Sequence, residues 1–221
     1  MNFATQRFLE TLNDDLLPIR GVIERFASSE VNLDPATGAL RLSHRPKIGT
    51  DAYACVLYPG VGSDLIDRYE RIQRARLSDY LEIPPFYRSL LTRLNGADLF
   101  GISLFGIPLS MAQDPPLLNR SVLQPLDVGT ANENWRLEYG VDRPHFHFAG
   151  GPYSNTENVG YFLTPDNRVE AYLAREKRIG EWKTVGAFLA AETDRAESRF
   201  PDFERMMESA QRAFKSKRKG R

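Results

Sequence analysis

Two histidines, His145 and His147, are the residues whose type and spacing most directly suggest chemistry. They lie two positions apart in a segment predicted to be a strand, so both rings would face the same side and could chelate zinc or copper with a third ligand from elsewhere. The sequence has no cysteine pair, HExxH motif or run of carboxylates to complete such a site. We therefore expect a polar strand face with Phe146 and Phe148 packed on its other side, no metal site and no cofactor.

Other catalytic patterns are incomplete. The glycine-bearing segments "PGVGSD" and "GGPYSN" lack the Lys-Ser/Thr pair of a phosphate-binding loop and the spacing of a dinucleotide-binding loop. The G-x-S-x-G elbow of serine hydrolases is absent, and Cys55 lies in an expected strand, where a thiol is more often a small core side chain than a nucleophile. We expect no catalytic residues and a protein that is not an enzyme, since an enzyme would need a constellation that sequence spacing does not reveal.

The segment from residue 126 to 160 is acidic. Its charged residues are Asp127, Glu133, Glu138, Asp142 and Glu157 against Arg136 and Arg143. Such a segment attracts basic protein surfaces and repels phosphate, or it is ordinary solvated surface. The residues that we expect to bind a partner are Glu133, Trp135, Glu138, Asp142 and Tyr153. In this hypothesis Trp135 is a buried anchor and the carboxylates set the association rate; the alternative role for Trp135 is core packing.

Hydrophobic periodicity predicts helices in the first 26 residues. Apolar residues recur at helical spacing from Phe8 to Leu16, and Pro18 suits the first turn of a second helix. The turn "DPATG" then separates two runs of alternating residues, which is typical of a hairpin, and "AYACVLY" is expected to be a short strand.

Two further helices are expected in the middle of the chain. Ser63 is predicted to be the N-cap of the first helix. The solvated face of this helix is expected to carry two ion pairs in which the acidic residue precedes the basic one by four positions, Asp67 with Arg71 and Glu70 with Arg74. The second helix follows the prolines of "IPPFYRSLL", and Asn95-Gly96 are predicted to end it before a strand over "ADLFGISLFG".

The rest of the chain predicts a short helix around Trp135, a strand over "HFHFAGG" and a hairpin over "NVGYFLTPDNRVEAYL". Thr184 is expected to cap a helix, and a last amphipathic stretch places apolar residues on one face: Phe203, Met206, Met207, Ala210 and Phe214. The predicted order along the chain is helices, then strands, then helices. This order indicates an α+β fold with an antiparallel-rich sheet packed against helices.

An ordered set of these motifs resembles the Smi/Knr-like branch of the SUKH superfamily. The matching segments are "DRYERIQRARLSDYLEIPPFYRSLLTRLNGADLFGISLFG", "TANENWR", "NVGYFLTPDNRVEAY" and "EWKTVGAFLAAE". The resemblance implies an α+β binding domain without a shared catalytic apparatus, and it transfers a fold and not a site, because the matching residues are mostly core. We expect an N-terminal helical and hairpin extension over residues 1–61, a SUKH-like domain over 62–199, and an amphipathic helix with a basic tail over 200–221.

Charge is unevenly distributed although the formal net charge is zero. The last ten residues hold six basic side chains and no acidic one, so the other 211 residues carry 23 basic and 29 acidic side chains, a formal charge of −6. Such a tail is usually solvated, and nucleic acid is expected only as a contact of this tail. A single cysteine, the absence of a long apolar run and a polar N-terminus predict a cytoplasmic protein without a membrane partner.

These observations favour a non-enzymatic protein-binding domain. The resemblance implies an immunity protein that neutralises a cognate toxin such as a nuclease, here a basic toxin domain that docks on the acidic segment. The alternative is a Smi/Knr-like regulatory scaffold that assembles cell-wall or other cytoplasmic partners through the N-terminal extension and the C-terminal helix.

Overall fold

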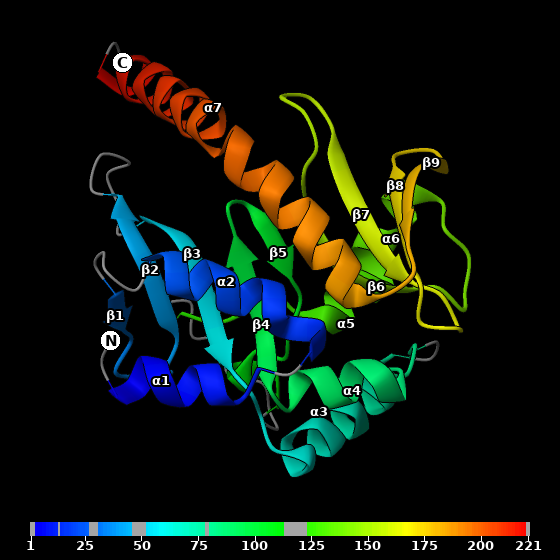
Figure 1. Ribbon diagram of the computed structural model, residues 1–221. Helices are drawn as coiled ribbons and strands as arrows, with labels where there is room; N and C mark the ends of the chain where they lie inside the picture. Colours follow the sequence, from blue (N-terminus) through cyan, green and yellow to red (C-terminus); the bar gives the residue numbers. More distant parts are fainter. Residues whose placement is uncertain are drawn as a thin grey trace.

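A single antiparallel sheet organises the chain. The computed structural model describes residues 3–12, 14–26, 31–45, 52–77, 80–112 and 123–219. Nine strands follow one another across the sheet in sequence order, and every neighbouring pair is antiparallel (Figure 1). The strands are β1 (Val31–Leu33), β2 (Leu40–Arg45), β3 (Ala52–Pro59), β4 (Leu94–Leu99), β5 (Ile102–Leu104), β6 (Phe146–Pro152), β7 (Asn158–Leu163), β8 (Val169–Leu173) and β9 (Lys177–Trp182). The predicted α+β class is confirmed.

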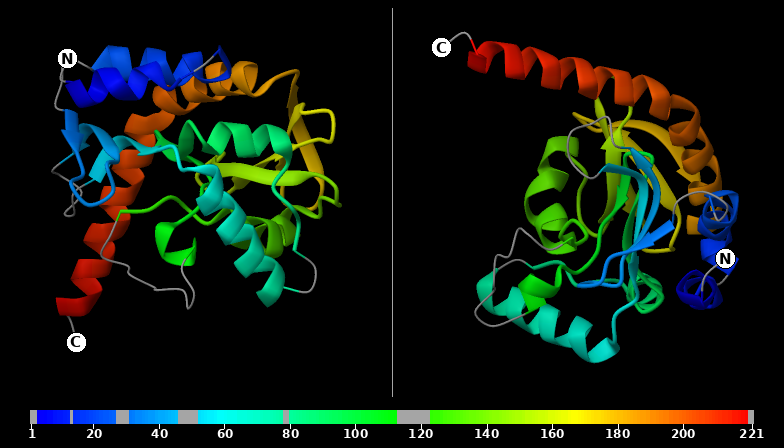
Figure 2. Two further views of the ribbon diagram at one scale, coloured as in Figure 1. Left: turned by 90° about the horizontal axis from the view of Figure 1, so that it is seen from below. Right: turned by 90° about the vertical axis from the view of Figure 1, so that its left-hand side faces the viewer.

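Helices cover both faces of this sheet. They are α1 (Phe3–Glu10), α2 (Leu17–Phe26), α3 (Ser63–Arg76), α4 (Pro85–Leu91), α5 (Val128–Thr130), α6 (Arg136–Tyr139) and α7 (Val185–Lys219). Short 3-10 turns η1 (Asp14–Leu16) and η3 (Leu109–Ala112) and the π-helix η4 (Ala131–Trp135) join them. Figure 2 shows α1, α2 and the first part of α7 on one side of the sheet and the α5–α6 segment on the other.

The main core lies between the sheet and the helices packed on it, which include α1, α2, α4 and the first half of α7. Phe146 and Phe148 of β6 point into it, as predicted: both rings contact Tyr87 of α4, with centroids 5.4 and 5.7 Å away. Phe148 also meets Phe188 of α7 at 5.3 Å. Thr184 caps α7 as expected, because its Oγ1 accepts a hydrogen bond from the Ala187 amide at 3.1 Å.

The predicted end of helix α4 is wrong. The helix stops at Leu91, and Asn95-Gly96 lie inside strand β4, where Gly96 has φ +89°. The Asn95 amide is buried and bonds both backbone groups of Ile107, which explains its place in the strand. The expected single strand over "ADLFGISLFG" is a hairpin, because Phe100 and Gly101 both adopt positive φ and form a two-residue turn.

The predicted charge pairs along α3 are also wrong. Glu70 is buried, and it accepts hydrogen bonds from the Ile83 backbone N–H at 3.0 Å and from the Arg88 guanidinium. Asp67 binds the same guanidinium, so both acidic residues link α3 to α4. The predicted N-cap is displaced by one residue: Gly62 occupies that position without a side-chain hydrogen bond.

Helix α7 continues past the sheet. Pro201 lies inside it, and Figure 2 shows its axis bending along its length. Strands β1 to β3, from the first 61 residues, belong to the same sheet as the later strands, and α7 runs through residue 200 without a break. The apolar side chains predicted between Phe203 and Phe214 lie outside the described side chains. Among the described helices, none combines the length and apolar character that crossing a bilayer requires.

Candidate partner-binding site

The first part of the acidic segment, residues 128–139, is one helical stretch in which α5, the π-helix η4 and α6 follow one another. The Asp127 carboxylate caps its start by accepting from the backbone N–H of Gly129 and of Thr130, and Gly140, with φ +68°, ends it. Between α5 and α6 lie the five residues of the π-helix η4, which end at Trp135. Single π turns inside helices often occur at functional sites because they displace a residue from the regular helical position.

The π-helix holds His147 of β6 in one position. The Asn132 side chain donates to the His147 carbonyl and accepts from its backbone N–H, both at 2.9 Å. The His147 ring donates from Nδ1 to the Ala131 carbonyl at 3.3 Å, because a carbonyl can only accept. The remaining ring atom, Nε2, therefore carries a lone pair, and it is buried without a hydrogen-bond partner among the described residues.

Burial keeps this imidazole neutral. It lowers the pKa of His147 to about 3, more than the nearby carbonyl oxygens of Ala131 and Ala149 raise it. The ring stacks on Phe162 at 4.4 Å and meets the rings of Phe105 and Tyr139 edge-on. A neutral ring with a fixed tautomer is a hydrogen-bond acceptor rather than a proton carrier at neutral pH.

A pocket of about 320 Å³ opens beside His147. The sheet forms the floor of the pocket. Ser103 of β5 is paired there with Gly150 of β6, and both residues have small side chains or none. Its remaining lining residues are Phe105, Leu126, Trp135, Glu138, Tyr139, Gly151 and Asn158. The volume lies at the lower end of the range of about 300–1,000 Å³ that is usual for small-ligand sites.

The structure brings two of the five predicted contact residues to this pocket. Trp135 and Glu138 line it, and the Trp135 ring also packs on Phe105 with centroids 5.3 Å apart, so it contributes to the core as well. Glu133 is half-buried and ion-paired with Arg143 at 3.8 Å. Asp142 is exposed in the turn that follows α6.

Tyr153 lies in a different place. It belongs to the loop after β6, where the Arg195 guanidinium stands 5.2 Å from its ring centroid and Arg199 donates to its carbonyl oxygen. Both arginines are on α7, which covers the opposite face of the sheet from α5 and α6 (Figure 2). Tyr153 therefore does not share a surface with the other four residues.

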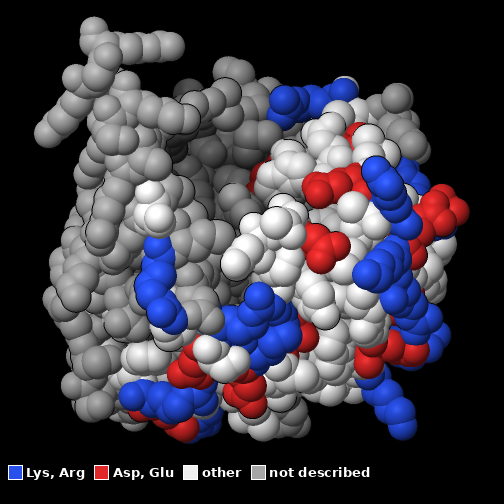
Figure 3. Space-filling view, turned by 90° about the horizontal axis from the view of Figure 1, so that it is seen from above, with Lys and Arg blue, Asp and Glu red and all other residues white. Residues whose placement is uncertain are grey.

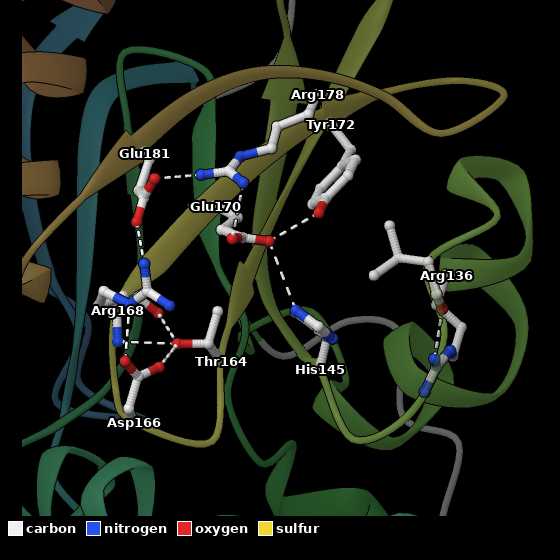
Figure 4. A network of polar contacts seen from close by, with 10 residues as sticks. Arg136, His145, Thr164, Asp166, Arg168, Glu170, Tyr172, Arg178 and Glu181 are labelled. Atoms are coloured by element: carbon white, nitrogen blue, oxygen red, sulfur yellow. Dashed lines mark hydrogen bonds and ion pairs between the residues drawn. The ribbon is translucent and has the colours of Figure 1, made fainter.

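His145 and His147 have separate partners. His145 precedes β6, and its Nε2 lies 3.4 Å from Glu170 of β8, which also binds Arg178 and Tyr172 (Figure 4). Glu181 extends the same network from Arg178 to Arg168. Within the described ranges, no group of three or more potential metal ligands assembles.

The surface around the pocket is apolar as well as acidic. Leu126, which lines the pocket, is 46% exposed, and Leu137, next to Glu138 on α6 but not in the pocket lining, is 73% exposed. Exposed apolar residues beside an aromatic side chain are typical of protein-binding surfaces. Elsewhere, on the coloured surface seen from above, basic and acidic side chains are intermingled (Figure 3).

Sequence reasoning considered His147 only as a possible metal ligand and expected it on a polar strand face, whereas the structure buries it among aromatic rings; it missed Ser103 and Gly150. The three residues come from two strands and meet only because Ser103 pairs with Gly150 and a β-bulge follows His147. The bulge places His147 and Gly150 near each other, so that a Cβ added to Gly150 would lie 3.7 Å from His147 Nε2. The paired glycines in "FAGG" were the available signal, since glycine in a strand often marks a close approach.

Comparison of the chain with protein-family models, with curated proteins and with solved structures finds no match. The resemblance to Smi/Knr-like proteins therefore stays a prediction from the quoted motifs.

Proposed function

We propose that this protein is a non-enzymatic binding domain of the immunity type, which neutralises a basic toxin by covering it. The observation that carries the proposal is the α6 surface, by which we mean Leu126, Trp135 and Glu138, which line the pocket, together with Leu137, the exposed neighbour of Glu138 on α6. It combines exposed apolar area, an aromatic ring and a carboxylate around a preformed pocket. Such a combination provides anchors for affinity and a charge for association rate and specificity.

Charge supports a basic partner. Without its last ten residues the chain has a formal charge of −6. Among the residues that line the pocket, Glu138 carries the charge and neither lysine nor arginine is present. A basic nuclease domain would be attracted to this surface, whereas a nucleic-acid phosphate would be repelled.

The test is a capture experiment with a matched variant. The tagged protein is purified from its native host, and co-purifying proteins are identified by mass spectrometry. The double variant Leu137→Asp, Glu138→Lys should lose a stoichiometric basic partner while its circular dichroism and unfolding midpoint stay unchanged. The control Leu17→Asp, Glu10→Lys changes equivalent residue types on the side of α1 and α2 and should retain the partner.

Function is then measured on the captured partner. The wild-type protein should suppress its nuclease or other toxic activity, and the α6-surface variant should not. Retention of the partner by that variant would contradict this surface, and a captured protein without suppressible activity would contradict the immunity role.

A second proposal is a regulatory scaffold, favoured by helix α7. Its last part projects beyond the sheet (Figure 1), and it leads into the basic end of the chain. A helix that extends beyond the sheet in this way suits assembly of other proteins. Partners that depend on residues after Phe200 and not on the α6 surface would support the scaffold over the immunity role.

A further inference from the structure

Two hydrogen-bond acceptors lie at fixed positions in the pocket lining, and one of them, His147 Nε2, is buried just beneath its surface. His147 is 1% exposed and its Nε2 lone pair has no partner among the described residues. Its tautomer is fixed by the Nδ1 hydrogen bond to Ala131, and its position by the two hydrogen bonds from Asn132. A buried acceptor without a donor costs free energy, so a ligand that supplies a donor there gains a strong preference.

Ser103 on the floor is a second acceptor. Its hydroxyl donates to the Asp98 carboxylate of β4 at 2.5 Å, so its oxygen has only lone pairs left for the pocket. Glu138 on α6 adds an exposed carboxylate to the lining. His147 Nε2 and the Ser103 oxygen can therefore only accept hydrogen bonds from a ligand. The Glu138 carboxylate favours a ligand with a positive charge.

The walls favour a flat group. Phe105, Trp135 and Tyr139 are aromatic, and the glycine lets them lie close to the sheet: a Cβ on Gly150 would lie only 3.2 Å from the Val159 carbonyl oxygen and 3.3 Å from the Phe105 ring, so the space beside it is narrow. Planar cations stack on aromatic faces and gain from cation–π attraction there. A guanidinium meets all these requirements, since it is flat, cationic and carries five N–H donors, whereas an ammonium is a compact and strongly hydrated point charge.

We propose that this pocket receives the arginine side chain of the protein partner, with the guanidinium near His147 Nε2 and balanced by Glu138. The inference rests on the proposed protein-binding function. The basic partner argued above supplies such a residue, and the pocket makes it the central anchor of the interface rather than one rim charge among many.

The test uses a small probe, so that it does not depend on the partner. N-acetyl-arginine methylamide is titrated into the full-length labelled protein, and the amide signal of Gly150 and the indole signal of Trp135 are followed by NMR. The matched control is N-acetyl-citrulline methylamide, which has nearly the same shape without the charge. We expect saturable shifts with the arginine probe and at least about tenfold weaker binding of the citrulline probe, which corresponds to about 1.4 kcal/mol.

Two variants locate the binding. Glu138→Gln should weaken binding of the arginine probe several-fold, and Glu10→Gln, a change at another exposed glutamate, on α1, should leave it unchanged. Gly150→Ala narrows the floor and should weaken both probes. Shifts that appear away from the pocket, equal binding of the two probes, or no saturation would overturn the arginine inference.

The outcomes separate this inference from the proposed function. If the probe fails while a basic partner is captured and lost with the α6-surface variant, the arginine inference is wrong and protein binding stands. If the probe binds in the pocket but no protein partner is captured, the pocket chemistry is right and the protein-binding function is wrong.

Discussion

At the scale of single residues, the pocket depends on how Asn132 holds His147. The amide satisfies both backbone groups of His147, which lies next to a β-bulge and beyond the last residue of β6 that pairs with β5. It also donates to the Val128 carbonyl at 2.9 Å, so one side chain joins the π-helix to the sheet. The position of His147 follows from this connection, and its tautomer from the Nδ1 hydrogen bond to the Ala131 carbonyl.

Asn132→Ala should lower the free energy of unfolding by about 2–4 kcal/mol, because it leaves two buried backbone groups of His147 without partners. Asn134→Ala, an exposed position of the same π-helix, should change stability by less than about 0.5 kcal/mol. Urea unfolding of the two variants provides the comparison. Equal losses of unfolding free energy in the two variants would mean that the hydrogen bonds of the Asn132 amide do not stabilise the fold more than an exposed side chain does.

His147 also predicts a pH dependence of stability. Its pKa is about 3 in the folded protein against an ordinary value of 6.5, so between these pH values the unfolded chain binds a proton that the folded protein does not. The free energy of unfolding should therefore rise with pH through this window, by up to about 1.4 kcal/mol per pH unit, and the contribution is lost as the pH falls toward 3.

The variant His147→Gln isolates this contribution, because glutamine does not titrate. Burial also raises the pKa of Asp98, which makes the free energy of unfolding fall as the pH rises. This effect is the same in the wild type and in His147→Gln, so it cancels when their free energies of unfolding are subtracted. Urea unfolding at several pH values between about 4 and 7 should show a flatter profile for the variant. Parallel profiles would contradict the neutral, buried ring.

At the scale of elements, local signals predicted most helices and strands, while interactions between elements had to come from the structure. The hairpin at "DPATG" and the Thr184 cap are local, and both are confirmed. Asn95-Gly96 carry the signal of a helix end, but the Ile107 backbone, distant in sequence, holds Asn95 in a strand. Strand β9 was missed because "KRIGEW" is only partly buried at the sheet edge and lacks an apolar alternation.

The same limit applies to the candidate site. Trp135 and Glu138 could be predicted from composition along one segment, because both lie on the same helical stretch. Ser103 and Gly150 could not be predicted, and neither could the place of His147 beside them, because strand register brings the three residues together. Tyr153 was grouped with the acidic segment by sequence distance alone, and the sheet separates it from α6.

Glu70 tests the link between α3 and α4. Glu70→Ala removes the acceptor of the Ile83 N–H and a partner of Arg88, so it should cost about 2–3 kcal/mol. The matched change Glu82→Ala breaks a pair with Arg74 in which the Glu82 side chain is 71% exposed, and it should cost less than about 1 kcal/mol. Chemical unfolding measures both, and similar costs would show that the buried pair is no stronger than the exposed one.

At the scale of the whole molecule, the long helix α7 has two parts. Its first part packs on the sheet: among the described side chains of α7, all the buried ones lie at or before Phe200. Beyond Pro201 the helix projects away from the sheet (Figures 1 and 2). The fold should therefore depend on the first part, and any role of the second should lie in contacts with other molecules.

Deleting residues 202–221 should change the free energy of unfolding by less than about 1 kcal/mol, because the buried anchors of α7 remain. Phe200→Ala in the full chain should cost about 3 kcal/mol, since the ring is 8% exposed and packs edge-on against Phe100 at 5.7 Å. The truncated protein also separates the two proposed functions. If the α6 surface binds a toxin, the truncated protein keeps the partner and the protection; if α7 assembles a scaffold, it loses its partners while the fold survives.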